Sequence, residues 1–254
     1  MLSQTQLAEF ARSGLLRLPG AIPGAEVATM RDRFWEVLSS KHGIARDRAE
    51  TWTIEHPRHL QVLKRSGAFN LMATGAVRAA LDDLLGASVW VEPQTWGLPL
   101  VTFPVPGTGW NVPSTGWHVD SYGPEHDLPG VTVFAFLAPV AAGGGGTVVL
   151  PGSGRMYNRH IAATGQWRPA ELKAALGAKH PWLRDLWGAD AQPGRVARYL
   201  EQGVTVDDTE LRVHQLTGSP GDVVLMHPRT LHAPAPNTAD TPRMMLVEII
   251  GRVP

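Results

Sequence analysis

The sequence predicts a mainly β fold with flanking helices, arranged as a sandwich or barrel. Short runs rich in Val, Thr, Phe and Trp follow residue 86, and clusters of Gly and Pro separate them. This texture is typical of consecutive strands joined by turns. The chain has 254 residues and 43% hydrophobic content, which suits one domain, 1–254, with a packed core.

The first 86 residues are expected to form a mainly helical support for this core. Residues 3–11 have an amphipathic helical pattern that opens with Ser-x-x-Gln, the spacing of a capping box. A strand is expected at 15–18. A second helix should follow Pro23, since its apolar residues recur at helical spacing, and a third is expected at 76–85.

The β core is expected to comprise 87–160 and 211–254. Its strands are predicted at 88–94, 98–105, 131–137, 147–150, 211–215, 222–226 and 243–250. Between the two parts lies a segment of different character, 162–204, with helix-like pieces at 169–176 and 195–200. Such an insertion is either a lid over the mouth of a pocket or a surface excursion without function, and both alternatives stay open.

Composition excludes several classes of function. The formal net charge is +0, so the basic footprint of a nucleic-acid-binding protein is missing. The chain has no cysteine, which excludes disulfides, thiolate nucleophiles and Cys-type metal sites; a metal would need His, Asp or Glu. The sequence has neither a secretory signal pattern nor a long apolar run, so we expect a cytoplasmic protein without a membrane partner.

A His-x-Asp pair in GWHVDSYG is the first candidate for chemistry. On a strand, the side chains of His118 and Asp120 would point to the same face. A pair of this kind arises readily by chance, so only the surrounding sequence can indicate whether it binds a metal. A second β segment supplies further histidines, His227 and His232. Two imidazoles and one carboxylate leave three positions of an octahedral metal open, as in Fe(II) oxygenases.

Three motifs together resemble the phytanoyl-CoA dioxygenase family of Fe(II)/2-oxoglutarate-dependent oxygenases. They are WHVDS around His118, GGGGTVVLPGS at 143–153 and LHAPAPN…PR at 231–243. The N-terminal stretch LAEFARSGLLRLPGAIPGAEVATMR is also similar to the opening of that family. The resemblance implies a double-stranded β-helix, a cupin-like jelly roll. It also implies Fe(II), 2-oxoglutarate and O₂ in the hydroxylation of an unactivated C–H bond, with release of succinate and CO₂.

The resemblance assigns roles to single residues. His118 and Asp120 correspond to the first two iron ligands and to catalytic residues. The third ligand is expected to be His232, because Arg243 follows it by 11 residues, whereas His227 is 16 residues away and is the alternative. Arg243 would bind the distal carboxylate of 2-oxoglutarate, since a guanidinium can donate two parallel hydrogen bonds.

Further assignments concern the cosubstrate and the substrate. Many relatives carry a hydroxyl residue two places after the distal histidine, where this chain has Pro234. Cosubstrate-binding hydroxyls are therefore expected from Thr147 or Thr102. Candidates for substrate binding are Trp117, Tyr122, Phe136 and Arg155.

The substrate class is expected to be a small molecule, and the Arg-rich, Lys-poor composition favours a bacterial enzyme of specialised metabolism. Two rival functions remain. One is a cupin-like metalloenzyme, an isomerase or direct dioxygenase, that does not use 2-oxoglutarate. The other is a non-catalytic β-sandwich binding module. Arg243 distinguishes these rivals from the oxygenase, because only an oxygenase that uses 2-oxoglutarate gives Arg243 a required role.

Overall fold

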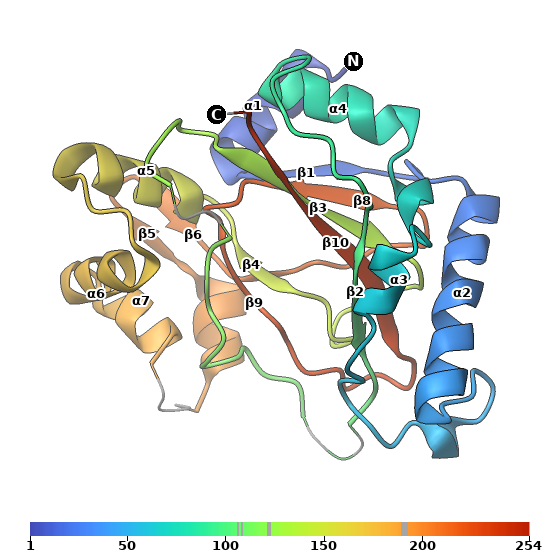
Figure 1. The fold of residues 1–254 in the computed structure, drawn as a ribbon. Helices are drawn as coiled ribbons and strands as arrows, with labels where there is room; N and C mark the ends of the chain where they lie inside the picture. The colour runs from blue at the N-terminus through green and yellow to red at the C-terminus, as the bar shows by residue number, and fades with distance from the viewer. Residues whose placement is uncertain (106, 108, 121–122, 189–192, 254) are drawn as a thin grey trace.

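A computed structural model describes residues 1–105, 107, 109–120, 123–188 and 193–253. Two antiparallel sheets face one another at its centre (Figure 1). The large sheet has the order β1 (Leu15–Leu18), β8 (Val223–Met226), β3 (Gly130–Phe136), β10 (Arg243–Gly251) and β2 (Leu98–Thr102). The small sheet has the order β7 (His214–Gln215), β4 (Val148–Leu150) and β9 (Leu231–Ala233).

Helices cover the outer faces of both sheets, so the fold is mixed α/β with antiparallel sheets. The expectation of a mainly β chain was too narrow. The N-terminal helical elements are α1 (Gln4–Ser13), α2 (Gly24–His42), η1 (Ala49–Thr51), α3 (Gln61–Arg65), η2 (Asn70–Met72) and α4 (Gly75–Leu85). The later ones are α5 (Ser153–Thr164), α6 (Pro169–Lys179), α7 (Pro181–Leu186) and the π-helix η3 (Val196–Gln202), with the hairpin β5 (Val204–Val206) and β6 (Thr209–Leu211) after them.

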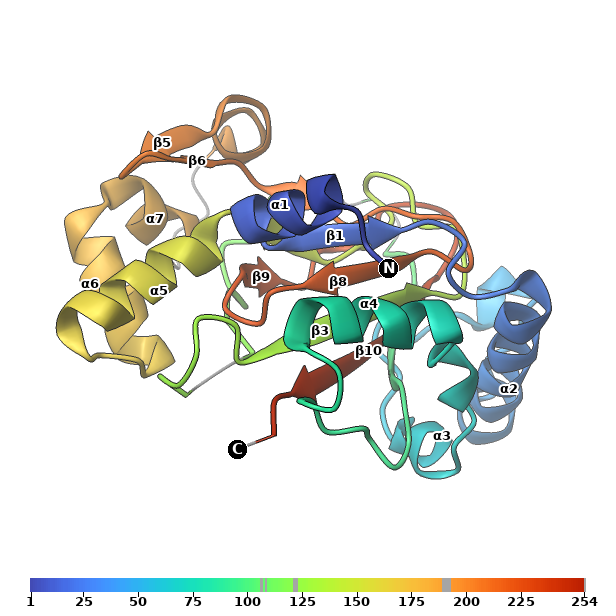
Figure 2. The same ribbon diagram turned by 90° about the horizontal axis from the view of Figure 1, so that it is seen from above.

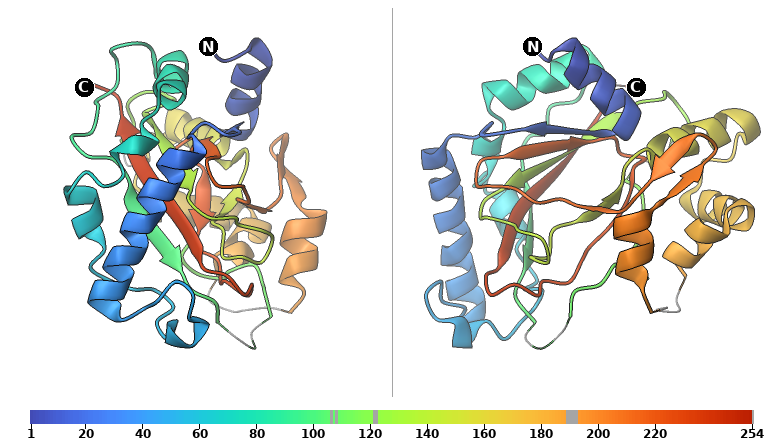
Figure 3. Two further views of the ribbon diagram at one scale, coloured as in Figure 1. Left: turned by 90° about the vertical axis from the view of Figure 1, so that its right-hand side faces the viewer. Right: turned by 180° about the vertical axis from the view of Figure 1, so that it is seen from behind.

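The N-terminal predictions are confirmed. The capping box is present, since the Ser3 hydroxyl accepts from the Gln6 amide while the Gln6 side chain accepts from the Ser3 amide. Helix α2 ends at Gly43, whose φ of 66° closes the helix in the left-handed conformation. Seen from the side, α2 lies across the large sheet (Figure 3), and seen from above, α4 covers the same face (Figure 2).

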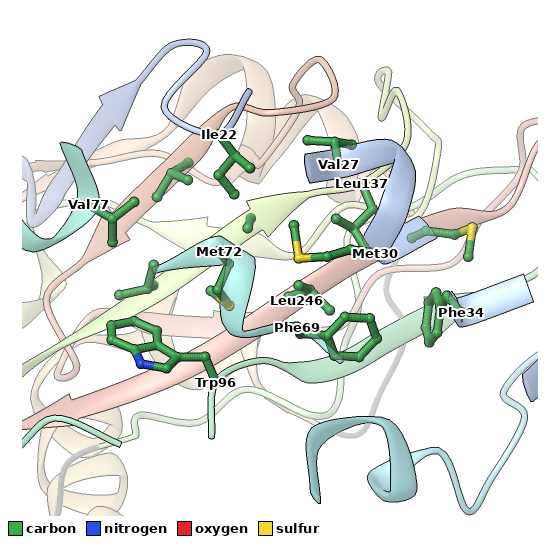
Figure 4. Packing of buried hydrophobic residues seen from close by; sticks show 14 of the residues in the cluster. Ile22, Val27, Met30, Phe34, Phe69, Met72, Val77, Trp96, Leu137 and Leu246 are labelled. Atoms are coloured by element: carbon green, nitrogen blue, oxygen red, sulfur yellow. The ribbon is translucent and has the colours of Figure 1, made fainter. Parts of the chain in front are cut away.

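The largest core lies between these helices and the large sheet. Met30 and Phe34 of α2 are fully buried there. They share this core with Phe69, directly before η2, and with Leu246 of β10 (Figure 4). Alternate residues of β10 face opposite ways, so Met244, Leu246 and Ile250 join this core. The intervening residues, Arg243, Met245, Val247 and Ile249, therefore face the space between the two sheets.

Two predicted boundaries were wrong. In the stretch 88–94 the structure has an isolated bridge, between Trp90 and Arg252, in place of a strand. The segment after 152 was expected to stay in the β core. Instead Gly152, with a φ of 81°, ends it and α5 begins. The Ser153 hydroxyl then donates to the Leu150 carbonyl and accepts from the Leu231 amide, which fixes the helix start against β9.

Segment 162–204 packs on the outer face of the small sheet. Leu172, Leu176 and Leu186 of its helices share a buried cluster with Val148 of β4 and Leu231 of β9. Figure 1 shows α6 and α7 on the far side of the molecule from α2. None of the helices in the described part of the chain is long and apolar enough to cross a membrane.

Candidate metal centre

His118, Asp120 and His232 bring their ligand atoms together between the two sheets. The Asp120 Oδ1 atom lies 3.8 Å from His118 Nε2 and 3.5 Å from His232 Nε2. The ligand atoms of all three residues lie within 4.8 Å of one another. Two mutual backbone hydrogen bonds of 2.9 Å join His118 to His232, so the His-x-Asp segment lies beside β9 like a short extra strand.

Local hydrogen bonds engage one polar atom of each side chain and leave free the atom that would bind a metal, Nε2 of each histidine and Oδ1 of Asp120. Nδ1 of His118 lies 2.7 Å from the Gly116 carbonyl, and Nδ1 of His232 lies 3.0 Å from the Thr230 carbonyl. A carbonyl can only accept, so each Nδ1 carries the proton and each Nε2 keeps its lone pair. The Thr132 hydroxyl donates to Asp120 Oδ2 at 2.9 Å and leaves Oδ1 facing the imidazoles. Outer partners of this kind orient metal ligands in proteins.

The electrostatics favour neutral imidazole on the buried side of the centre. Burial lowers the pKa of His232, while the nearby Asp120 carboxylate opposes that shift. A neutral imidazole is the form that binds a metal. The side chain of His232 is 6% exposed and that of His118 is 49% exposed, so the centre opens toward solvent on the His118 side.

Arg243 is a buried cation on the inner face of β10. It is 5% exposed, and burial lowers its pKa to about 10. Its Nε has no hydrogen-bond partner, and among the described residues no carboxylate lies within 4.0 Å of the guanidinium. A buried charge without a partner is costly. Thr102 of β2 is its direct cross-strand neighbour and is 1% exposed.

A cavity of about 530 Å³ reaches Arg243 from the edge of the large sheet. Leu98, Leu100 and Pro234 form part of its wall. Residues 56–61 also line it, and among them Arg58 is exposed. The cavity could therefore admit a small anion to the buried guanidinium.

Two of the aromatic residues predicted to bind substrate do not line the centre. Trp117 alternates with His118 and points the other way, into the cluster under the insertion helices, where its Nε1 donates to the Pro113 carbonyl. Phe136 is fully buried between the sheets, with the Arg17 guanidinium 5.9 Å from its ring centre. Phe134, one inward position closer to the centre, has its ring 6.4 Å from that of His232.

The remaining candidates differ in position. Thr147 is 5% exposed, directly before β4, whose Val149 is the cross-strand neighbour of His232. Arg155 lies on α5 and lines a separate cavity of about 340 Å³ with Phe10 and His227, and no member of the triad borders that cavity. Tyr122 lies outside the described residues.

The alternative histidine, His227, uses both ring nitrogens elsewhere. Its Nε2 donates to the Asp127 carbonyl at 2.7 Å, and its Nδ1 accepts from the Arg229 amide at 3.0 Å. Burial lowers its pKa to about 4. No lone pair is left for a metal, which supports His232 as the third ligand.

Sequence reasoning missed Thr132 and Phe134. Both belong to β3, an otherwise apolar strand in which every residue is buried. A single threonine in such a strand needs a hydrogen-bond partner, and this was the available signal. Its partner, Asp120, is 12 residues earlier, so the pairing depends on the fold.

Several solved structures of similar fold contain 2-oxoglutarate, which is also called alpha ketoglutarate. The epimerase SnoN, in complex with Fe³⁺, alpha ketoglutarate and nogalamycin RO, matches with a TM-score of 0.53 and 16% identity over 98% of this chain and 82% of that one. EvdO2 from Micromonospora carbonacea var. aurantiaca, complexed with 2-oxoglutarate, matches with a TM-score of 0.56 and 17% identity over 100% and 92%. EctD from S. alaskensis, with 2-oxoglutarate and 5-hydroxyectoine, matches with a TM-score of 0.57 and 17% identity over 98% and 76%.

These likenesses establish the fold as that of 2-oxoglutarate-dependent oxygenases, built on a double-stranded β-helix. No curated protein matches the chain by sequence search. The sequence profile of the phytanoyl-CoA dioxygenase family matches residues 10–245, which include the triad and Arg243. The chain belongs to the phytanoyl-CoA dioxygenase family.

Proposed function

We propose that this protein is an Fe(II)- and 2-oxoglutarate-dependent oxygenase that hydroxylates a C–H bond of a small molecule. The observation that carries the proposal is the pairing of two sites between the sheets. One is a His–Asp–His triad with its ligand atoms within 4.8 Å. The other is the buried guanidinium of Arg243, which has no carboxylate within 4.0 Å among the described residues. A metal alone would explain the first site. A carboxylate ligand beside that metal would also explain Arg243.

The donor set fits the proposed metal. Two imidazole nitrogens and one carboxylate oxygen suit Fe(II) and leave positions open for a chelating cosubstrate and O₂. His118, Asp120 and His232 would hold the iron. The chemistry that such a loaded centre supplies is oxidative decarboxylation of 2-oxoglutarate to succinate and CO₂, coupled to substrate oxidation.

Arg243 would bind the distal carboxylate of 2-oxoglutarate and fix its direction. Its guanidinium can donate two parallel hydrogen bonds, and burial strengthens them because water does not compete. Thr102, directly across from it on β2, would add a hydroxyl donor. Thr147 would face the opposite side of the cosubstrate, beside the non-donating Pro234.

The substrate would lie on an apolar wall of the large sheet. Ile249 of β10 is 51% exposed on the inner face, although it is the cross-strand neighbour of Thr132, the residue that holds Asp120. Leu98 of β2 is 38% exposed on the same face, beside Val247. Because no charge interrupts these three side chains, we propose a substrate that presents an uncharged face to them.

Hydroxylation is the proposed outcome because Asp120 occupies the position that a halide would need. Proteins of similar fold carry out different reactions, since SnoN is an epimerase and SnoK a carbocyclase. The choice between outcomes depends on where the target C–H bond lies relative to the triad.

Anaerobic titration tests the cofactors. Fe(II) and 2-oxoglutarate added together should give a weak visible absorption band that neither gives alone. The Arg243→Met variant should bind Fe(II) normally but need far more 2-oxoglutarate for the band. Iron binding with no response to 2-oxoglutarate would favour a cupin-like enzyme, and failure to bind iron would favour a binding module.

The apolar wall has a test of its own. Ile249→Asp should leave the absorption band and the slow substrate-free formation of succinate unchanged, because Ile249 is neither a member of the triad nor a lining residue of the Arg243 cavity. It should abolish the stimulation of succinate formation by uncharged test compounds such as cyclohexanol and indole. Equal stimulation of the variant and the parent chain would place the substrate elsewhere.

A further inference from the structure

The insertion 162–204 packs against the segment that carries His118 and Asp120, on the side that faces away from the space between the sheets. In this segment, residues alternate between the two sides. His118 and Asp120 face the space between the sheets, whereas Trp117 and Val119 are 3% and 2% exposed in the cluster formed with the insertion helices. Residues 112–119 thus form a thin layer between the candidate metal centre and the insertion.

Arg195 is the strongest link between the two. It is 2% exposed and donates to four backbone carbonyls. Two belong to the segment that leads to the triad: Nε donates to Val112 at 2.9 Å and Nη2 to Pro113 at 2.8 Å. The other two, Asp185 and Leu186, belong to α7, at 3.1 and 2.6 Å. One guanidinium therefore ties the insertion to the metal-bearing segment.

The surroundings hold this guanidinium in a single position. Its centre lies 4.7 Å from the ring centre of Tyr199, one turn further along the π-helix η3. The Tyr199 ring in turn meets that of Trp182, with centres 4.8 Å apart. Tyr199 is 1% exposed. A stacked arginine that makes four such hydrogen bonds cannot be replaced by lysine without losing donors.

A second link lies directly next to the first ligand. The Lys173 ammonium of α6 donates to the Trp117 carbonyl at 3.0 Å, one residue before His118. Burial lowers the pKa of Lys173. The Trp117 indole donates to the Pro113 carbonyl at 2.8 Å, the same carbonyl that Arg195 binds. The carbonyls of 112, 113 and 117 are therefore all fixed by side chains rather than by a sheet partner.

We infer that Arg195 and Lys173 are positioning residues, through which the insertion presets the metal-binding geometry of His118 and Asp120. The inference rests on the proposed function, since it needs those residues to bind a metal. It gives the insertion a role distinct from that of a lid: it fixes the backbone on which two of the three ligands stand. The third ligand, His232, lies on β9, which also pairs with β4 of the small sheet.

The experiment compares metal affinity with stability in matched variants. Lys173→Met removes one hydrogen bond next to His118, and Arg195→Lys removes the two-pronged contact while keeping the charge. Arg184→Met is the control, since Arg184 is exposed on α7 and pairs with Asp185 at the surface. Each folded variant is titrated with Co(II), which reports on ligand geometry through its visible spectrum, and its thermal unfolding is measured without metal.

A positioning role predicts that Co(II) affinity and the Co(II) spectrum change more than the unfolding temperature does. Partners outside the ligand sphere are worth roughly 10–100-fold in metal affinity. Lys173→Met should weaken Co(II) binding by about tenfold and alter its spectrum, with little change in unfolding temperature. Arg195→Lys should weaken Co(II) binding more strongly and should also lower the unfolding temperature, because buried carbonyls lose their donors. The control should change neither readout.

The outcomes separate this inference from the proposed function. Variants that unfold earlier but bind Co(II) with the parent affinity and spectrum would overturn the positioning role and leave a purely structural one. If Arg195→Lys does not fold, Lys173→Met decides alone. A parent chain that binds no metal would refute the proposed metal centre itself.

Discussion

Replacing Arg243 by methionine should strengthen the unliganded fold and abolish binding of 2-oxoglutarate. The two effects have opposite signs because the guanidinium is buried without a carboxylate partner among the described residues. Burial lowers its pKa from the ordinary arginine value to about 10, which at about 1.4 kcal/mol per pKa unit corresponds to about 3 kcal/mol of unfavourable burial. This cost is present at any pH below about 10, where the folded chain must carry the charge.

Methionine is unbranched, apolar and suited to the buried site. The free energy of unfolding of the unliganded variant should therefore rise by up to about 3 kcal/mol, or roughly 6–12 °C in unfolding temperature for a chain of this size. Loss of two charge-assisted hydrogen bonds should weaken 2-oxoglutarate binding by more than about a hundredfold. Iron affinity should stay unchanged, since the guanidinium is not part of the triad.

The assay is thermal unfolding with and without 2-oxoglutarate, beside a titration of succinate formation. At a cosubstrate concentration of about 100 Kd, the parent chain should gain about 2.7 kcal/mol, and the variant should gain nothing. Arg58→Met, which replaces an exposed residue that lines the same cavity, is the control for loss of one positive charge. If Arg243→Met destabilised the unliganded chain and bound 2-oxoglutarate as before, Arg243 would be a structural residue and the cosubstrate would bind elsewhere.

Three further perturbations test the centre and its surroundings. His118→Ala should abolish Fe(II) binding and turnover, and Asp120→Gly should abolish hydroxylation, each with the fold intact by circular dichroism; full activity of either variant would exclude the replaced residue as a ligand. Thr132→Val keeps the volume but removes the hydrogen bond to Asp120 Oδ2, so iron affinity should fall about tenfold by calorimetry; an unchanged affinity would show that the threonine does not orient the carboxylate. His227 has its pKa lowered from 6.5 to about 4, so the folded state binds fewer protons than the unfolded state in that window. Stability should therefore fall as pH drops from 6.5 to 4, by up to about 3 kcal/mol, and a His227→Gln variant should show a flatter profile in denaturant titrations at each pH.

The N-terminal half of the fold was predictable because its signals are local. A capping box, an apolar stripe and a closing glycine each act within one or two turns, and α1 and α2 begin and end close to where the pattern indicates. The long apolar strands β3 and β10 were predictable for a similar reason. Short elements were not: β9 has three residues between a Pro-rich loop and a turn, and its strand character comes from pairing with β4.

The aromatic candidates show why side-chain direction was harder to predict than position. Trp117 is adjacent to His118, so proximity in sequence suggested a place in the pocket. On an extended segment, adjacency guarantees the opposite, because neighbours point to opposite faces. The same alternation predicted correctly that His118 and Asp120 point the same way, as the distance of 3.8 Å between them confirms.

The ligand triad and its support differ in how much of them a sequence can reveal. A metal ligand needs a particular side chain, so His118, Asp120 and His232 stand out by residue type. The groups that orient them are mainly backbone carbonyls, at Gly116 and Thr230 for the imidazoles and at Pro113 for the segment beneath. Every residue has a carbonyl, so none of these roles leaves a mark in the sequence.

The consequence concerns the insertion and not only the triad. A His-x-Asp segment without a full sheet partner needs donors for its own carbonyls, and here Arg195 and Lys173 provide them from outside the β core. Trimming the insertion to make a smaller enzyme would remove those donors while leaving every ligand in place. Such a chain would keep the family motif and bind the metal more weakly, because ligand identity and ligand geometry are encoded in different parts of the sequence.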